Sequence, residues 1–272
     1  MADAFHLGGS GEPLVLLHGF TGTWEAWTPV LPMLERYHTV FAPTLPGHYG
    51  GEPFPAGTRI SIPASLDMIE RQLDAQGIER AHFVGSSLGG WLALELAGRG
   101  RALSVTGICP AGCWERGPAP WAVLMYFRRN DLLLKIGQPL RLLPFVARRP
   151  HLRALALFEV VTRPVSADAA YMMFTGAANC AIVPDAIKLA ASGDMFGDLP
   201  AIDCPVRIAY GTRDRLIHWP GHYTMIHRQK PDADYIALEG LGHLAMWDDP
   251  ELVARTILEV TAPDRVPELA AA

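Results

Sequence analysis

Three short segments contain the residue types that a hydroxyl nucleophile requires. Ser87 lies in Gly-Ser-Ser-Leu-Gly, Asp214 closes Gly-Thr-Arg-Asp, and His243 closes Gly-Leu-Gly-His. A neutral serine is a weak nucleophile at pH 7, so it needs a base, and the base needs a carboxylate that fixes its tautomer and stabilises its charged form. We therefore predict that Ser87 attacks a substrate, that His243 takes its proton, and that Asp214 orients His243.

The surroundings of Ser87 make this prediction more specific. The apolar run 81–84 predicts a strand that ends just before Ser87, and residues 88–97 predict a helix that begins just after it. At such a turn the hydroxyl projects from the sheet, and Gly85 and Gly89 avoid side chains that would clash. The ordinary alternative is that the glycines only permit close packing and that Ser87 caps the helix.

Position in the chain favours His243 and Asp214 over their competitors. His243 follows the last predicted strand, and Asp214 directly follows the strand predicted at Val206–Tyr210. Active sites of parallel sheets form at this carboxyl edge, whereas Asp203 lies before a strand start. The alternatives are that Asp214 only stabilises a turn and that His243 is a core residue.

A tetrahedral intermediate also needs two N–H donors. The predicted helix start supplies the backbone N–H of Leu88, and His18-Gly19-Phe20 follows an early predicted strand. Gly19 allows a sharp turn that points the N–H of Phe20 inward. We predict that Phe20 and Leu88 form the oxyanion hole, and that His18 is a structural hydrogen-bonding residue.

Short apolar runs alternate with helix-length segments along the chain, which predicts a doubly wound α/β fold with a mainly parallel sheet and helices on both faces. This alternation stops after Ile108, where proline-rich helical patterns follow. We predict a helical cap at 114–198 between two parts of the core, 1–113 and 199–272. The predicted strands are Leu14–Leu17, Thr39–Ala42, His82–Gly85, Val105–Ile108, Val206–Tyr210 and Asp234–Leu238.

Taken together, HGF, LPGHYG, GSSLGG, GTRD and GLGH resemble the α/β-hydrolase superfamily over nearly the whole chain outside the cap. The resemblance implies an eight-stranded sheet, a cap after the sixth strand, and a Ser87–His243–Asp214 triad that works without a cofactor. It also implies that Phe20 and Trp114 flank the nucleophile and contact the substrate. Few residues precede Leu14, so a single opening strand, and hence seven strands, is the other form that we expect.

Composition narrows the classes of partner. The chain has 272 residues, a formal net charge of -5 and half of its residues apolar, which fits a globular enzyme and argues against a nucleic-acid partner. We expect a cytoplasmic protein without a membrane span, because no leader pattern and no long apolar run is visible. The spacing of Cys109 and Cys113 does not suit zinc, so we expect no metal site.

The cap differs in charge from the rest of the chain. Between Cys113 and Arg163 there are nine Lys or Arg residues and three Asp or Glu residues. A cationic lid could steer an anionic substrate, although solvated helix faces are the ordinary explanation and a lid on a membrane surface is a third. The cap's aromatic and methionine side chains suffice to cover an apolar pocket.

The leading functional hypothesis is hydrolysis of a carboxylic ester or related small acyl compound. Hydrolysis of a carbon–carbon bond in a dienoic ketone or diketone is an alternative, since enzymes of that kind share the triad and cap. Epoxide hydrolases and haloalkane dehalogenases of this superfamily carry a carboxylate where Ser87 stands, which disfavours both chemistries. A small-molecule receptor that retains the triad is the alternative from another class. The sequence predicts no oligomeric state.

Overall fold

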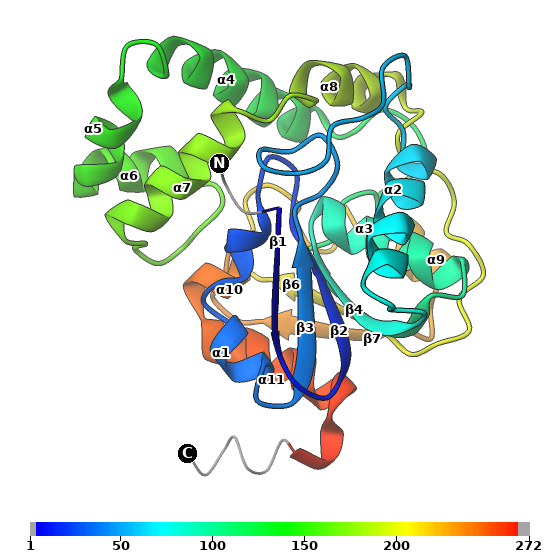
Figure 1. Cartoon of the computed structure of the whole chain (residues 1–272). Coiled ribbons are helices and arrows are strands. Elements are labelled where there is room, and N and C mark those ends of the chain that lie inside the picture. Colours follow the sequence, from blue (N-terminus) through cyan, green and yellow to red (C-terminus); the bar gives the residue numbers. More distant parts are fainter. Residues whose placement is uncertain (1–3, 266–272) are drawn as a thin grey trace.

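The computed structural model describes residues 4–265 (Figure 1). Seven strands form one sheet in the order β1-β3-β2-β4-β5-β6-β7. Strand β1 pairs with β3 in the antiparallel sense, and every other pair is parallel. The strands are β1 (Phe5–Gly9), β2 (Glu12–Leu17), β3 (His38–Pro43), β4 (Ala81–Ser86), β5 (Ala102–Ile108), β6 (Val206–Gly211) and β7 (Asp234–Leu238).

All six predicted strands are confirmed. The sheet has seven strands rather than eight, because β1 alone takes the place of an opening pair. Consequently the helices of the predicted cap follow β5, the fifth strand of the chain, rather than a sixth.

Helices cover both faces of the sheet. They do so because apolar side chains point alternately to the two faces along the strands. In β2, Leu14 and Leu16 belong to the apolar cluster that includes α1 (Leu31–Leu34), α10 (Ala245–Asp248) and α11 (Pro250–Thr261). Val15 and Leu17 belong to the cluster on the other face, which includes α2 (Ile62–Ala75), α3 (Leu88–Gly98) and α9 (Thr224–Gln229). Successive strand residues point to opposite faces, so each of the strands β2 to β6 contributes to both clusters.

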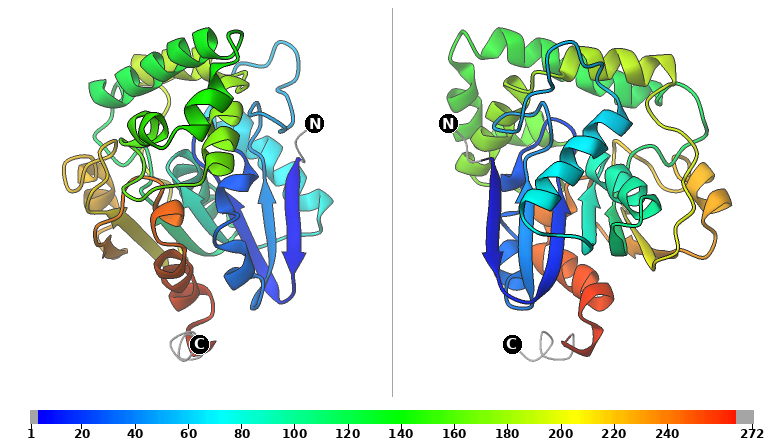
Figure 2. Two further views of the ribbon diagram at one scale, coloured as in Figure 1. Left: turned by 90° about the vertical axis from the view of Figure 1, so that its left-hand side faces the viewer. Right: turned by 45° about the vertical axis from the view of Figure 1, so that its right-hand side comes forward.

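Five helices between β5 and β6, here called the cap helices, lie above the carboxyl ends of the strands (Figures 1 and 2). Prolines separate them, since Pro139 follows α4 and Pro150 begins α6. The division of the chain at 114 and 198 stays a prediction. The cap helices are α4 (Trp121–Gly137), α5 (Leu142–Arg148), α6 (Pro150–Leu157), α7 (Ala167–Ala178) and α8 (Val183–Ser192). Within residues 4–265, none of the helices combines the length and the apolar character that crossing a bilayer requires.

Candidate active site

Ser87 occupies a strained turn between β4 and α3. Its φ is 53° and its ψ is -115°, a backbone conformation that L-residues rarely adopt. Two flanking glycines make the turn possible: a side chain on Gly85 would collide with the Gly89 carbonyl, and one on Gly89 would collide with the Leu17 carbonyl. The turn therefore requires both glycines, as the motif predicts.

His243 and Asp214 meet at the neighbouring strand ends. The Nδ1 atom of His243 lies 2.7 Å from Asp214 Oδ2, and both side chains are buried. Asp214 Oδ1 accepts the backbone N–H groups of Leu216 at 2.8 Å and Ile217 at 2.9 Å. Burial opposes ionisation of Asp214, but the positive charge of a protonated His243 and these hydrogen bonds leave the carboxyl pKa below its ordinary value. An ionised Asp214 can hold His243 with its Nε2 atom free to accept a proton.

Ser87 and His243 face the same cavity, which has a volume of about 600 Å³. Among residues 4–265 no hydrogen bond joins the Ser87 hydroxyl to His243. Hydrogen bonds between catalytic groups are often long in unliganded sites and shorten when a substrate is bound.

The two predicted oxyanion donors lie beside Ser87. Leu88 is the first residue of α3, so its N–H has no partner within the helix. Phe20 lines the cavity together with Ser87. A Cβ on Gly19, the residue before Phe20, would lie 3.2 Å from the Ser87 Cβ, so Gly19 keeps the approach to Ser87 open.

His18 has a structural environment. Its Nδ1 atom donates to the Gly19 carbonyl at 2.8 Å, and its Nε2 atom accepts the Leu45 N–H at 2.9 Å. Burial and the nearby His48 hold the pKa of His18 well below its ordinary value. A neutral His18 with both nitrogens occupied fixes the two loops that it joins.

The cavity wall is largely apolar and comes mainly from the cap. Helices α4 to α7 supply most of the side chains, among them Phe127, Leu134, Met173 and Phe174. Two of the lining side chains, Arg129 and Asp131, are charged. Arg129 pairs with Glu159 and Asp131 pairs with Lys135. The site is therefore suited to an apolar group.

A second, smaller chamber of about 50 Å³ lies against Ser87 and contains the predicted contact residue Trp114. Phe20 and Phe127 line both chambers, and their rings meet edge to face with centroids 4.9 Å apart. This aromatic pair divides the space around Ser87 into a large compartment and a small one.

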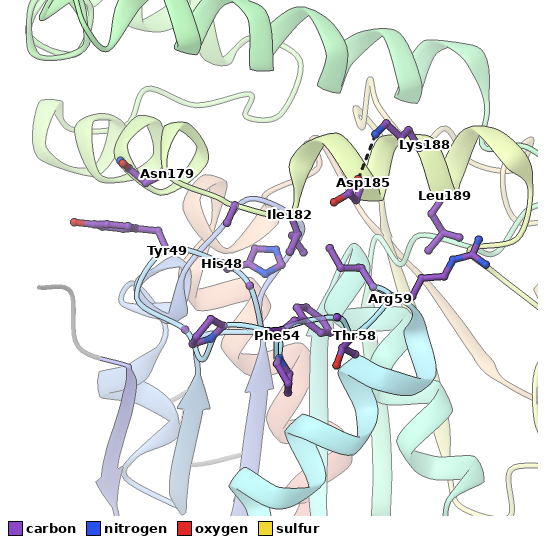
Figure 3. A pocket seen from close by; sticks show the side chains of 18 of the residues that line it. His48, Tyr49, Phe54, Thr58, Arg59, Asn179, Ile182, Asp185, Lys188 and Leu189 are labelled. Carbon is purple, nitrogen blue, oxygen red and sulfur yellow. Dashed lines mark hydrogen bonds and ion pairs between the residues drawn. The ribbon is translucent and has the colours of Figure 1, made fainter.

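A larger hollow of about 980 Å³ lies elsewhere, between the loop 47–60 and α8 (Figure 3). His48, Arg59 and Lys188 line it, but Ser87, Asp214 and His243 do not. Because it contains none of the three predicted catalytic residues, the smaller apolar cavity is the better candidate for the active site.

Two residues near the site were not predicted. The first is Cys109 at the end of β5, whose sulfur lies with Asp214 and His243 within 4.8 Å of one another. Burial, followed by the negative charge of Asp214, raises the pKa of the Cys109 thiol well above its ordinary value. Metal-binding cysteines are thiolates, and Asp214 is already engaged by His243, so this group fits a packed neutral thiol better than a metal ligand set.

The second is Asp248, a buried carboxylate that joins the His243 loop to the cap. Its Oδ2 atom accepts the Gly242 N–H at 2.6 Å, and its Oδ1 atom accepts those of Thr162 at 2.7 Å and Arg163 at 2.9 Å. The Leu244 N–H also donates to the Val160 carbonyl, at 2.8 Å. The segment that follows α6 therefore fixes the backbone on both sides of His243.

Comparison with known proteins shows the family of the chain. Residues 14–256 match the model of a family described as "Alpha/beta hydrolase family". The chain belongs to this family. One relative of this α/β-hydrolase is epoxide hydrolase EphH of Mycobacterium tuberculosis, which is 32% identical over 196 residues that cover 70% of the chain and 90% of the relative.

Two further comparisons extend over almost the whole α/β-hydrolase. Putative carbamate hydrolase RutD of Stutzerimonas stutzeri is 26% identical over 266 residues, 94% of this chain and 95% of the relative. The solved structure of a thermophilic esterase from Thermogutta terrifontis aligns with a TM-score of 0.73 at 20% identity, covering 97% of this chain and 93% of the esterase, which supports the fold. Relatives with hydrolase names support a general hydrolase activity for this α/β-hydrolase.

Proposed function

We propose that this α/β-hydrolase cleaves carboxylic esters of apolar acyl compounds, with Ser87 as nucleophile, His243 as base and Asp214 as the residue that orients the base. The observation that carries the proposal is the shared cavity: Ser87 on its strained turn faces the same apolar space as His243, whose Nδ1 atom is hydrogen-bonded to Asp214. A strained serine, a base oriented by a carboxylate and an apolar space beside both are features that acyl transfer through a serine uses.

The proposed reaction has two halves. Ser87 Oγ attacks the ester carbonyl carbon and gives its proton to His243 Nε2, while the backbone N–H groups of Phe20 and Leu88 stabilise the oxyanion. Collapse of this intermediate breaks the ester C–O bond, and His243 returns the proton to the leaving alcohol. Water, deprotonated by His243, then attacks the acyl carbon of the acyl-enzyme. The bond between this carbon and Ser87 Oγ breaks, His243 returns the proton to Ser87 Oγ, and the acid is released.

The two chambers suggest how the substrate lies. The larger apolar compartment suits the longer chain of the ester, and the smaller one, next to Trp114, suits a short group. Because Arg129 at the cavity is paired with Glu159, apolar contacts support substrate binding better than attraction of an anion. A cytoplasmic location and the lack of a nucleic-acid partner stay predictions.

Epoxide opening is the rival activity, because one relative is named an epoxide hydrolase. Ser87 opposes it, since epoxide hydrolases of this superfamily use a carboxylate nucleophile at that position. Hydrolysis of a carbon–carbon bond in a diketone, and ligand binding without turnover, are the other activities that the same residues could serve.

Turnover of p-nitrophenyl esters of increasing acyl length tests the proposal. The wild-type protein should hydrolyse them and Ser87→Ala should not, while Ser86→Ala is the matched control because Ser86 is a buried neighbour whose hydroxyl has no partner among the described residues. An epoxide and a diketone are assayed in parallel. Turnover of either without ester hydrolysis would reject the proposal.

A further inference from the structure

The cap carries an unusual amount of exposed apolar surface. Of the thirteen exposed large apolar side chains among residues 4–265, eleven lie between Trp121 and Tyr171. Large apolar patches on a protein surface usually mark an interaction site. We define the cap patch as six of these residues from the α5 and α6 region: Leu140, Leu142, Phe145, Leu152, Leu155 and Phe158.

The cap patch is continuous with the candidate active site. Leu142, Leu152 and Leu155 are 42%, 38% and 68% exposed, yet they also line the cavity that contains Ser87 and His243. The cavity therefore reaches the surface within the cap patch. Figure 1 shows α5 and α6 at the far edge of the cap, away from the sheet, where a flat partner could approach them.

Basic residues are interspersed with the cap patch along the sequence. From Leu132 to Phe158 the sequence contains five Lys or Arg residues and no Asp or Glu, in a protein whose formal net charge is -5. Lys135 pairs with Asp131, whereas in the described part of the chain Arg141, Arg148, Arg149 and Arg153 have no carboxylate partner. The Arg149 guanidinium lies 4.5 Å above the Phe145 ring, so charge and apolar surface are adjacent.

We propose that the cap patch and its arginines bind the surface of an anionic lipid bilayer. A bilayer interface offers an apolar layer beneath negatively charged phosphates, and it matches a face that combines leucine and phenylalanine side chains with unpaired arginines. Bound in this way, the mouth of the cavity faces the lipid. The binding itself does not depend on the proposed function, whereas entry of a lipid acyl chain into the cavity rests on it.

Co-sedimentation with vesicles tests the proposal. Wild-type protein should sediment with vesicles of phosphatidylcholine and phosphatidylglycerol at low ionic strength, bind pure phosphatidylcholine vesicles far more weakly, and lose affinity at high salt. Leu140→Glu should weaken binding at least tenfold, while Leu7→Glu, at an exposed leucine on β1, should not. Arg148→Gln should weaken binding about fivefold, the factor for one basic residue near an anionic surface, while Arg255→Gln on α11 should not.

Each variant is also assayed with a water-soluble short ester. Leu140 and Arg148 do not line the cavity, so retained hydrolysis separates a failure of lipid binding from a failure of the proposed function. Absence of binding to anionic vesicles, or equal losses in the control variants, would overturn the proposal. A wild-type dimer that Leu140→Glu converts to a monomer would also overturn it, because a second copy of the chain would then cover the cap patch.

Discussion

Backbone strain and buried charge at single residues define the candidate site. The φ of 53° at Ser87 is held by the close packing of β4, α3 and β2 at Gly85 and Gly89. Asp214 stays ionised in a buried position because three hydrogen-bond donors surround it. Backbone strain at Ser87 costs folding free energy and burial opposes ionisation of Asp214, so their occurrence beside one cavity favours a functional explanation over a structural one.

Replacing Asp214 by Asn should leave the fold intact and reduce turnover by about ten-thousandfold, because the amide favours the wrong tautomer of His243. Ester hydrolysis and the circular dichroism spectrum are the measurements. Asp203→Asn makes the same change at an exposed carboxylate and should keep full activity. Unchanged turnover in Asp214→Asn would assign the acid to another residue.

Contacts between elements hold these residues in place. Helix α3 approaches β2 so closely that Gly89 has no room for a side chain, and the backbone of the His243 loop is tied to the segment after α6 through Asp248. The first contact fixes the nucleophile turn relative to the oxyanion loop, and the second fixes the base relative to the cap.

Gly89→Ala should destabilise the protein by about 1–3 kcal/mol or more, because the new methyl group forces α3 away from the Leu17 carbonyl. Urea denaturation measures the change. Gly197→Ala is the control, since nothing lies within 4 Å of its added Cβ. Equal stability of the two variants would show that α3 can shift without cost.

Asp248→Asn should lower the free energy of unfolding by about 1–3 kcal/mol, because one buried N–H group then faces the amide NH₂ instead of an acceptor. Asp249→Asn changes the adjacent residue, which caps α11 through the Leu252 N–H at 2.9 Å. Asn is as good a helix cap as Asp, so this control should lose little stability. A larger loss of unfolding free energy in Asp249→Asn than in Asp248→Asn would show that Asp248 does not hold the His243 loop in place.

Five of the six predicted strands, β2 to β6, are largely buried and therefore appear as apolar runs. Strand β1 instead alternates between exposed and half-buried residues and ends in two glycines. Ser87, Asp214 and His243 could be proposed because each follows a strand. Asp248 could not, because its partner Thr162 lies 86 residues away and only the folded chain brings them together.

Over the whole molecule, stability should depend on pH through buried neutral histidines. Burial lowers the pKa of His48 to about 4 from its ordinary 6.5, and His18 is lowered well below its ordinary value. The unfolded chain therefore takes up protons first as the pH falls, so the contribution of these residues is complete above about pH 6.5 and is lost toward pH 4. Asp214, whose pKa is also lowered, adds a further loss in more acid solution.

For His48 alone, the free energy of unfolding should fall by about 3 kcal/mol between pH 6.5 and pH 4. Urea denaturation at a series of pH values measures this slope, and His48→Gln should flatten it because glutamine does not titrate. An identical slope in the variant would show that His48 is not one of the groups responsible.

The proposed reaction passes through a covalent acyl-enzyme on Ser87. Mass spectrometry of the protein treated with a fluorophosphonate tests it most directly, because the serine oxygen displaces fluoride and keeps the phosphonyl group. We predict a single adduct on the peptide that contains Ser87 in the wild type and in Ser86→Ala, with none in Ser87→Ala. An adduct on another residue, or none in the wild-type protein, would contradict the assignment of Ser87 as the nucleophile.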